Sequence, residues 1–249
     1  MTAAQISGTG TVEDDWRPWL AQQLASWPVL DLREVDGPLV VAPHPDDEVL
    51  AAGGLLALTA NPIVIGLSDG EASHPRSPTL SPPELATRRS CERREAVRRL
   101  REPSGAGPVH IVECHLPDGG LVEHEARIAD LLMTYLNPDR WCIAPWQHDG
   151  HPDHEAAGRA AAAACLDTGA RLLSYPVWSW HWARPADPRL PWAQAITVPL
   201  SCEVSARKAA AIAAFGTQLE PLSDAPEDAA ILPQDIVDRF HRPYEVFFR

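Results

Sequence analysis

The sequence predicts an α/β fold, a Rossmann-like three-layer sandwich with a mostly parallel central sheet. Short apolar runs rich in β-branched residues alternate with helix-like stretches of ten or more residues, which is the pattern of repeated β-α-β units. The length of 249 residues suits one α/β domain, and 45% hydrophobic residues are enough for its core. No repeat or linker divides the sequence, so we expect one domain over 1–249, with residues 1–34 as an N-terminal extension.

The elements follow in order from local patterns. Residues 1–10 are small and polar and predict a loose tail, after which tryptophan and leucine recur at helical spacing and predict a helix that closes before Pro28. Apolar runs predict strands at 38–42, 62–67, 109–113, 141–144, 172–177 and 196–199. Periodic or alanine-rich stretches predict helices at 48–59, 83–101, 125–136, 154–167 and 204–215. Trp178, Trp180 and Trp182 alternate, which indicates one face of a strand.

The composition limits the partners and the compartment. The excess of 34 acidic over 21 basic residues gives a net charge of −13, which argues against nucleic acid and anionic membranes, because both need a basic surface. Five widely spaced cysteines without a Cys-x-x-Cys pair predict reduced thiols. Residues 1–12 lack the features of a signal peptide, and no apolar run approaches the ~20 residues of a membrane helix. We therefore expect a cytoplasmic protein without membrane insertion.

A histidine and two aspartates follow the first predicted strand, in the segment Pro43-His44-Pro45-Asp46-Asp47-Glu48. His44 and Asp47 lie three residues apart in a tight turn, so their side chains can converge on one point. A simple helix start accounts for one proline and one aspartate, through backbone geometry and the helix dipole. It does not account for a histidine at the end of the strand, so the segment favours a functional site.

A second cluster follows the fourth predicted strand, in the segment His148-Asp149-Gly150-His151-Pro152-Asp153-His154. Three of the ten histidines fall within these seven residues. A surface loop with solvated histidines is the alternative interpretation. The carboxyl ends of parallel strands meet at one edge, where such sheets bind ligands, so the two segments can come together there. The pair of segments therefore predicts a metal site.

The available donors indicate which metal this site would bind. Two imidazoles and one carboxylate, with a position left open for water, are typical of catalytic zinc. The segments offer no thiolates and no all-oxygen cage of the kind that calcium or magnesium prefers. Fe²⁺ accepts the same three ligands, so Zn²⁺ is the expected cofactor and Fe²⁺ the alternative.

The motifs at 44–48 and 151–154, taken together and in this order, resemble the PIG-L/LmbE-like family of zinc-dependent N-acetylglucosaminyl de-N-acetylases. The resemblance extends over about residues 35–249 and leaves out the first helix and the tail. It implies that three residues bind the metal, namely His44, Asp47 and His154.

The same resemblance implies roles for other residues. Asp46 matches the general base, His151 matches the group that stabilises the oxyanion and protonates the leaving amine, and Asp153 would orient His151. Weaker matches imply substrate contacts by four residues, namely Glu71, Arg89, Asp118 and Asp149. Asp149 occupies a place where some relatives carry a tyrosine that can bond the oxyanion.

The implied function is that of a hydrolase acting on a linear amide C–N bond. It would remove an N-acetyl group from an N-acetylglucosamine-type glycoconjugate, a small molecule, with water activated by the metal as nucleophile. One alternative is an amidase on the same scaffold that cleaves a thiol- or antibiotic-type conjugate. Another is a non-catalytic sugar- or metal-binding module, which would need the metal ligands but has no use for Asp46 or His151.

Overall fold

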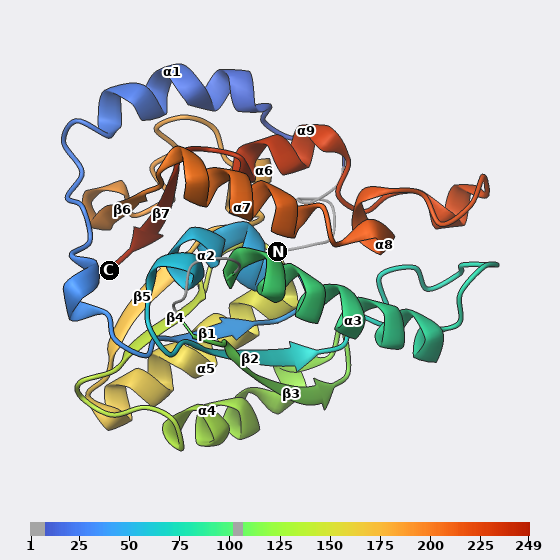
Figure 1. Ribbon diagram of the computed structural model, residues 1–249, viewed down its shortest axis with the longest axis horizontal. Helices are drawn as coiled ribbons and strands as arrows, with labels where there is room; N and C mark the ends of the chain where they lie inside the picture. Colours follow the sequence, from blue (N-terminus) through green and yellow to red (C-terminus); the bar gives the residue numbers. More distant parts are fainter. Residues whose placement is uncertain (1–7, 102–106) are drawn as a thin grey trace.

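A computed structural model describes residues 8–101 and 107–249 of the protein. Within these residues, seven strands form one sheet in the order β3-β2-β1-β4-β5-β7-β6 (Figure 1). Strands β1 to β5 run parallel, and β7 lies antiparallel between β5 and β6. The strands are β1 Leu39–Ala42, β2 Ile63–Ser68, β3 His110–Leu116, β4 Trp141–Pro145, β5 Arg171–Tyr175, β6 Ala195–Pro199 and β7 Tyr244–Phe248.

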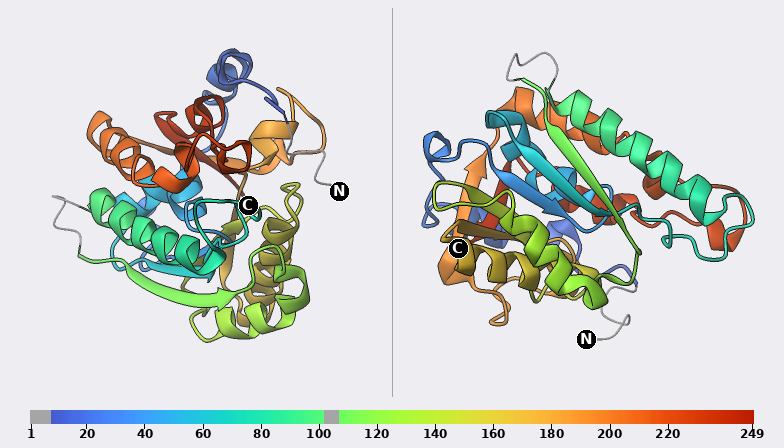
Figure 2. Two further views of the ribbon diagram at one scale, coloured as in Figure 1. Left: turned by 90° about the vertical axis from the view of Figure 1, so that its right-hand side faces the viewer. Right: turned by 90° about the horizontal axis from the view of Figure 1, so that it is seen from below.

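Helices cover both faces of the sheet. Helices α4 and α5 lie on one face, and α2, α3 and α7 lie on the other (Figures 1 and 2). The α-helices of the described chain are α1 Glu13–Gln23, α2 Asp47–Leu58, α3 Pro82–Arg101, α4 Glu125–Met133, α5 Pro152–Thr168, α6 Ser179–Trp182, α7 Cys202–Ile212, α8 Gly216–Leu219 and α9 Gln234–Val237. Successive side chains of a strand point to opposite faces, so Val40 and Val41 of β1 belong to two different hydrophobic cores.

The predicted fold class is confirmed: the sheet is mostly parallel and lies between two layers of helices. The predicted strands are all present, although some of their ends differ from the predicted ones by up to about three residues. The predicted first helix begins near the expected position, but α1 ends at Gln23, so Trp27 packs from a loop. Residues 1–7 of the predicted tail lie outside the described residues.

Two sequence predictions about the C-terminal half were wrong or incomplete. The alternating tryptophans do not form a strand, because residues 179–182 make the short helix α6. The seventh strand, β7, was not predicted, since Glu245 interrupts its apolar run. Glu245 is nevertheless buried, because its carboxylate accepts hydrogen bonds from Nζ of Lys208 (2.6 Å) and from the backbone of Gly54 (2.6 Å).

The N-terminal extension packs against α6. Nε1 of Trp16 donates to the carbonyl oxygen of Trp180 (3.0 Å), and the two rings meet edge to face. Glu13 forms a buried ion pair with Arg242 (2.6 Å), whose guanidinium also lies over the ring of Trp180. Of the helices in the described residues, none is both long and apolar enough to cross a membrane.

Candidate active site

The sheet topology brings the two sequence clusters together. Strands β1 and β4 are neighbours at the centre of the sheet, with Val40 paired to Ile143. The chain leaves β1 through His44 and enters α2, and it leaves β4 through residues 146–151 and enters α5. Both connections lie at the carboxyl edge of the sheet, as expected for ligand binding in a parallel α/β fold.

The three predicted metal ligands converge on one point. Oδ2 of Asp47 lies 3.3 Å from Nδ1 of His44 and 3.3 Å from Nε2 of His154. Zinc bonds of about 2.0–2.1 Å in a tetrahedral site separate neighbouring ligand atoms by about 3.3 Å. Nε2 of His154 is buried and faces Asp47 without any other polar partner among the described residues, so a metal ion can take the place of the ring proton there. These residues therefore fit a divalent metal ion.

The outward-facing nitrogens of both histidines are held by carboxylates. Nδ1 of His154 lies 2.9 Å from Oδ2 of Asp149. Nε2 of His44 lies 3.2 Å from Oδ1 of Asp118 and 3.2 Å from Oδ2 of Asp153. Such contacts place the proton on the outer nitrogen and leave the inner nitrogen free to bind a metal.

The excess of carboxylates makes the site attractive to a positive charge. Burial lowers the pKa of His154, but the charge of Asp47 and the hydrogen bond to Asp149 outweigh burial and raise this pKa to about 9. The surrounding carboxylates favour a proton on the His154 ring in the metal-free chain. They equally favour a metal cation, which would replace that proton.

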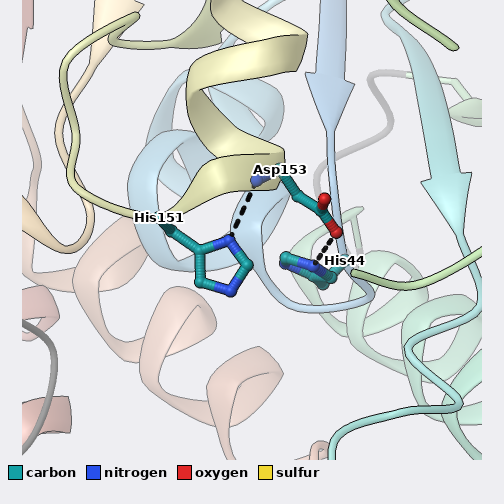
Figure 3. A group of neighbouring side chains, drawn as sticks. All are labelled: His44, His151 and Asp153. Carbon is teal, nitrogen blue, oxygen red and sulfur yellow. Dashed lines mark hydrogen bonds and ion pairs between the residues drawn. The ribbon is translucent and has the colours of Figure 1, made fainter. Parts of the chain in front are cut away.

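A second group of potential ligands overlaps with the first and comprises His44, His151 and Asp153 (Figure 3). The carboxylate of Asp153 and Nδ1 of His151 are already hydrogen bonded. The carboxylate of Asp153 accepts the backbone N–H groups of Gly119 (2.7 Å) and Leu121 (3.1 Å) as well as the contact with His44. Nδ1 of His151 accepts the backbone N–H of Asp153 (3.2 Å). The group of His44, Asp47 and His154 is therefore the better metal site.

Asp46 faces the pocket from the position just before α2. Its backbone has φ 153° and ψ −34°, a strained conformation for a residue other than glycine, as found at functional sites. Oδ2 of Asp46 accepts a hydrogen bond from Nη2 of Arg89 (3.0 Å). Burial raises the pKa of Asp46 to about 7, against the opposing charge of Arg89. A carboxylate with this pKa is suited to accept a proton near neutral pH.

His151 lines the same pocket, and its ring lies nearly parallel to that of Trp178. Burial lowers the pKa of His151 to about 3, so the ring is neutral in the metal-free chain at neutral pH. Since Nδ1 accepts the N–H of Asp153, the ring proton belongs on Nε2. His151 can thus offer an N–H donor to a bound ligand.

Two predicted partners lie in different places from those expected. The carboxylate of Asp153 contacts His44 instead of orienting His151, which is bonded by the backbone of residue 153 (Figure 3). Asp149 is fully buried below His154 and cannot touch a substrate. Its carboxylate is occupied by Ser179 Oγ and by backbone N–H groups of residues 177–179.

Among the other predicted substrate residues, Arg89 and Asp118 line the pocket and Glu71 does not. Oε1 of Glu71 instead accepts the backbone N–H of Asp118 (2.9 Å), which fixes the loop that carries this aspartate. The pocket has a volume of about 500 Å³, and His44 and Asp47 are among its lining residues. A larger cavity of about 920 Å³ lies beside residues 10–18 and 181–189 and contains none of the predicted site residues.

Residues outside the two motifs complete the pocket. Gln218 and residues 230–232 reach it from the C-terminal part of the chain, and Val177 and Trp178 reach it from the loop after β5. Residues 230–232 carry no motif, so only the contacts between distant loops reveal them. The aromatic run around Trp178 was a usable signal, since aromatic faces suit sugar rings.

A family model described as PIG-L, GlcNAc-PI de-N-acetylase, matches residues 39–165, just over half of the chain. The chain belongs to this family. The match includes both motifs and ends within α5, so the N-terminal extension and the C-terminal pocket wall lie outside it. No curated protein matches the chain by sequence.

Several solved structures share the fold of this chain. A conserved protein from Thermus thermophilus is 29% identical, with a TM-score of 0.51, over 74% of this chain and 80% of that one. The A40926 pseudoaglycone deacetylase is 21% identical, with a TM-score of 0.60, over 87% and 96% of the two chains. A zinc-inhibited form of teicoplanin deacetylase is 20% identical, with a TM-score of 0.58, over 84% and 96%.

Proposed function

We propose that this PIG-L family protein is a zinc-dependent deacetylase that hydrolyses the N-acetyl amide of an N-acetylglucosamine-type conjugate. The observation that carries the proposal is the convergence of His44, Asp47 and His154 on one point directly beside Asp46. Membership of a deacetylase family supports the reaction type. The donor set supports zinc, with Fe²⁺ as the alternative metal.

Different residues of the chain carry out different steps of amide hydrolysis. A bound zinc ion supplies a Lewis acid that lowers the pKa of water and polarises a carbonyl group. Asp46 accepts the proton of the attacking water as the oxygen adds to the carbonyl carbon. Nε2–H of His151 donates a hydrogen bond to the developing oxyanion. The C–N bond then breaks as the amine nitrogen takes the proton held by Asp46, because a neutral His151 would become an imidazolate if it gave up its Nε2 proton. The acid product leaves as acetate after its hydroxyl proton passes to the released amine.

The pocket favours an enzyme over a non-catalytic binding module. Asp46 and His151 line the pocket without belonging to the group of metal ligands that we prefer. Asp46 is a proton acceptor with a pKa near 7, and His151 is a neutral N–H donor. Neither property is needed to bind a metal, whereas both are useful in catalysis. An amidase acting on an antibiotic-type conjugate would use the same residues, so the two enzymes differ in the pocket walls alone.

A direct experiment measures metal content and acetate release together. Protein purified without a metal-binding tag should contain about one zinc per chain and release acetate from an N-acetylglucosamine conjugate. Removal of the metal by a chelator should abolish release, and added Zn²⁺ should restore it. The matched control is Asp46→Asn, which should keep the metal and lose the activity. Metal-loaded protein that releases no acetate from any N-acetylated sugar would reject the proposal.

A further inference from the structure

One side of the pocket carries no charge. The side chains on this side belong to α2, to the loop after β5 and to the segment before α9. Trp178 lies beside the ring of His151, with ring centroids 6.2 Å apart and an angle of 21° between the planes. The uncharged side therefore begins next to the proposed hydrogen-bond donor. We call this set the apolar wall, and its members are Leu50, Val177, Trp178, Ile231 and Leu232.

The charged side of the pocket offers no free cation. Arg89 is the one lysine or arginine among the described pocket residues. Its Nη2 donates to Oδ2 of Asp46 (3.0 Å) and to the carbonyl oxygen of Pro45 (3.0 Å), and its Nη1 donates to the carbonyl oxygen of Gly70 (2.9 Å). Asp47 and Asp118 also line this side. A phosphate or carboxylate on the substrate would thus meet carboxylates without a counter-charge, except at the metal itself.

The apolar wall is held in place by contacts between two loops. Oδ2 of Asp228 accepts hydrogen bonds from Thr79 Oγ1 (2.5 Å) and Ser223 Oγ (2.5 Å). Nε2 of His74 contacts the carbonyl oxygen of Ala229 (3.2 Å), and the backbone N–H of Leu232 donates to the carbonyl oxygen of Gln218 (2.8 Å). Because Ile231 and Leu232 follow directly on this network, the wall is formed before a ligand binds, which reduces the entropy cost of binding.

On the basis of the proposed function, we propose that the substrate is an uncharged N-acetyl amino sugar that carries an apolar aryl or alkyl aglycone. The sugar amide lies at the metal ligands and the apolar group lies against the apolar wall. Removing an aryl or alkyl group from water against this wall favours binding, whereas a charged group loses hydration without a partner. Because the proposed reaction releases acetate from the nitrogen, the apolar group is joined on the aglycone side of the sugar.

Binding of deacetylated products tests the wall without turnover. Calorimetry on the zinc-loaded protein would compare glucosamine, phenyl β-glucosaminide, the N-octyl analogue of glucosamine and glucosamine 6-phosphate. We expect phenyl β-glucosaminide to bind at least tenfold more tightly than glucosamine, and the phosphate to bind no more tightly. Tighter binding of the N-octyl compound alone would place the apolar group on the acyl side and overturn the inference. Equal binding of the three ligands that lack phosphate, or tighter binding of the phosphate, overturns the inference.

Two variants test whether the apolar wall causes the preference for apolar ligands. The preference is measured as the dissociation constant of glucosamine divided by that of the tighter apolar derivative. Ile231→Ser should reduce this ratio by about tenfold, because small apolar groups in a pocket typically change discrimination by roughly 10–200-fold. Leu166→Ser is the matched control, because Leu166 is 85% exposed on α5 and outside the pocket, and it should leave the ratio unchanged. An unchanged ratio in Ile231→Ser overturns the inference.

Acetate release from phenyl N-acetyl-β-glucosaminide and from N-acetylglucosamine separates this inference from the proposed function. If acetate is released at equal rates from both compounds and their products bind equally, the inference about the apolar wall is rejected and the proposed deacetylase function is retained. If apolar derivatives bind more tightly but no acetate is released, the inference about the wall is retained and the proposed deacetylase function is rejected.

Discussion

Oδ2 of Asp149 lies 2.9 Å from Nδ1 of His154, and both side chains are fully buried. The contact directs Nε2 of His154 towards Asp47 and fixes the ring tautomer. Asp149 is itself held by backbone N–H groups of residues 177–179, which continue into the apolar wall. One buried carboxylate thus joins the candidate metal site to the wall of the pocket.

The first prediction follows from this contact. Asp149→Asn should weaken zinc binding by about 10–100-fold, because partners of metal ligands typically contribute that much to affinity. Titration of metal-free protein with Zn²⁺ against a competing chelator measures the change. Asp139→Asn, on the exposed surface, is the control and should bind zinc normally. Wild-type affinity in Asp149→Asn would show that His154 does not bind the metal.

The second prediction distinguishes the two overlapping groups of potential ligands. His154→Ala should lose zinc, whereas His151→Ala should retain about one zinc per chain and lose most of the activity. The reason is that Nε2 of His154 is buried without a hydrogen-bond partner, while Nδ1 of His151 is already bonded to the backbone. Elemental analysis of both purified variants measures the outcome. The reverse pattern would place the metal at His44, His151 and Asp153.

The third prediction concerns the proposed base. Asp46→Asn keeps the size of the side chain and removes its ability to accept a proton. Loss of general base catalysis is expected to lower kcat by about 10²–10⁴-fold, with a metal content close to the wild-type value. Steady-state kinetics on an N-acetylated substrate measures the effect. A kcat near the wild-type value would remove Asp46 from the mechanism.

The fourth prediction is the pH dependence of kcat/KM. Burial raises the pKa of Asp46 to about 7, while Arg89 lowers it. Protonated Asp46 cannot accept a proton, so activity should fall as the pH drops through this value. A bound metal ion nearby lowers the pKa and moves the acid limb below pH 7.

Removing the charge of Arg89 should shift that limb. Arg89→Gln should move it to higher pH by about one unit or more, since a neighbouring opposite charge typically shifts a pKa by 1–3 units. Arg89→Lys keeps the charge and serves as the control with a smaller shift. An acid limb that stays in place in Arg89→Gln would contradict the assignment to Asp46.

The fifth prediction concerns the N-terminal extension. Glu13→Gln breaks a buried ion pair with Arg242 and leaves that guanidinium without its counter-charge. Such a loss typically costs about 3–5 kcal/mol, which chemical denaturation can measure. Glu34→Gln is the control, because its ion pair with Arg171 is exposed and should contribute less than about 1 kcal/mol. Equal stabilities would show that the extension does not contribute through this pair.

The parallel sheet and the meeting of the two motifs follow from local sequence patterns. Local alternation of apolar runs and helices specifies β-α-β units, and in a parallel sheet the residues that follow each strand share one edge. His44 and the 151–154 segment could therefore be placed together, although Asp153 lies 109 residues after His44 along the chain. Family resemblance added roles for Asp46 and His151 that spacing alone did not supply.

The groups that support the ligands, and the segments that close the pocket, depend on contacts between distant parts of the chain. The direction of the Asp149 and Asp153 carboxylates depends on backbone N–H groups at 177–179 and 119–121, which no local pattern connects to them. The antiparallel strand β7 and the 230–232 segment likewise depend on contacts between distant parts of the chain. Local sequence specifies where a strand ends, whereas long-range packing and hydrogen bonding decide which side chain faces which neighbour.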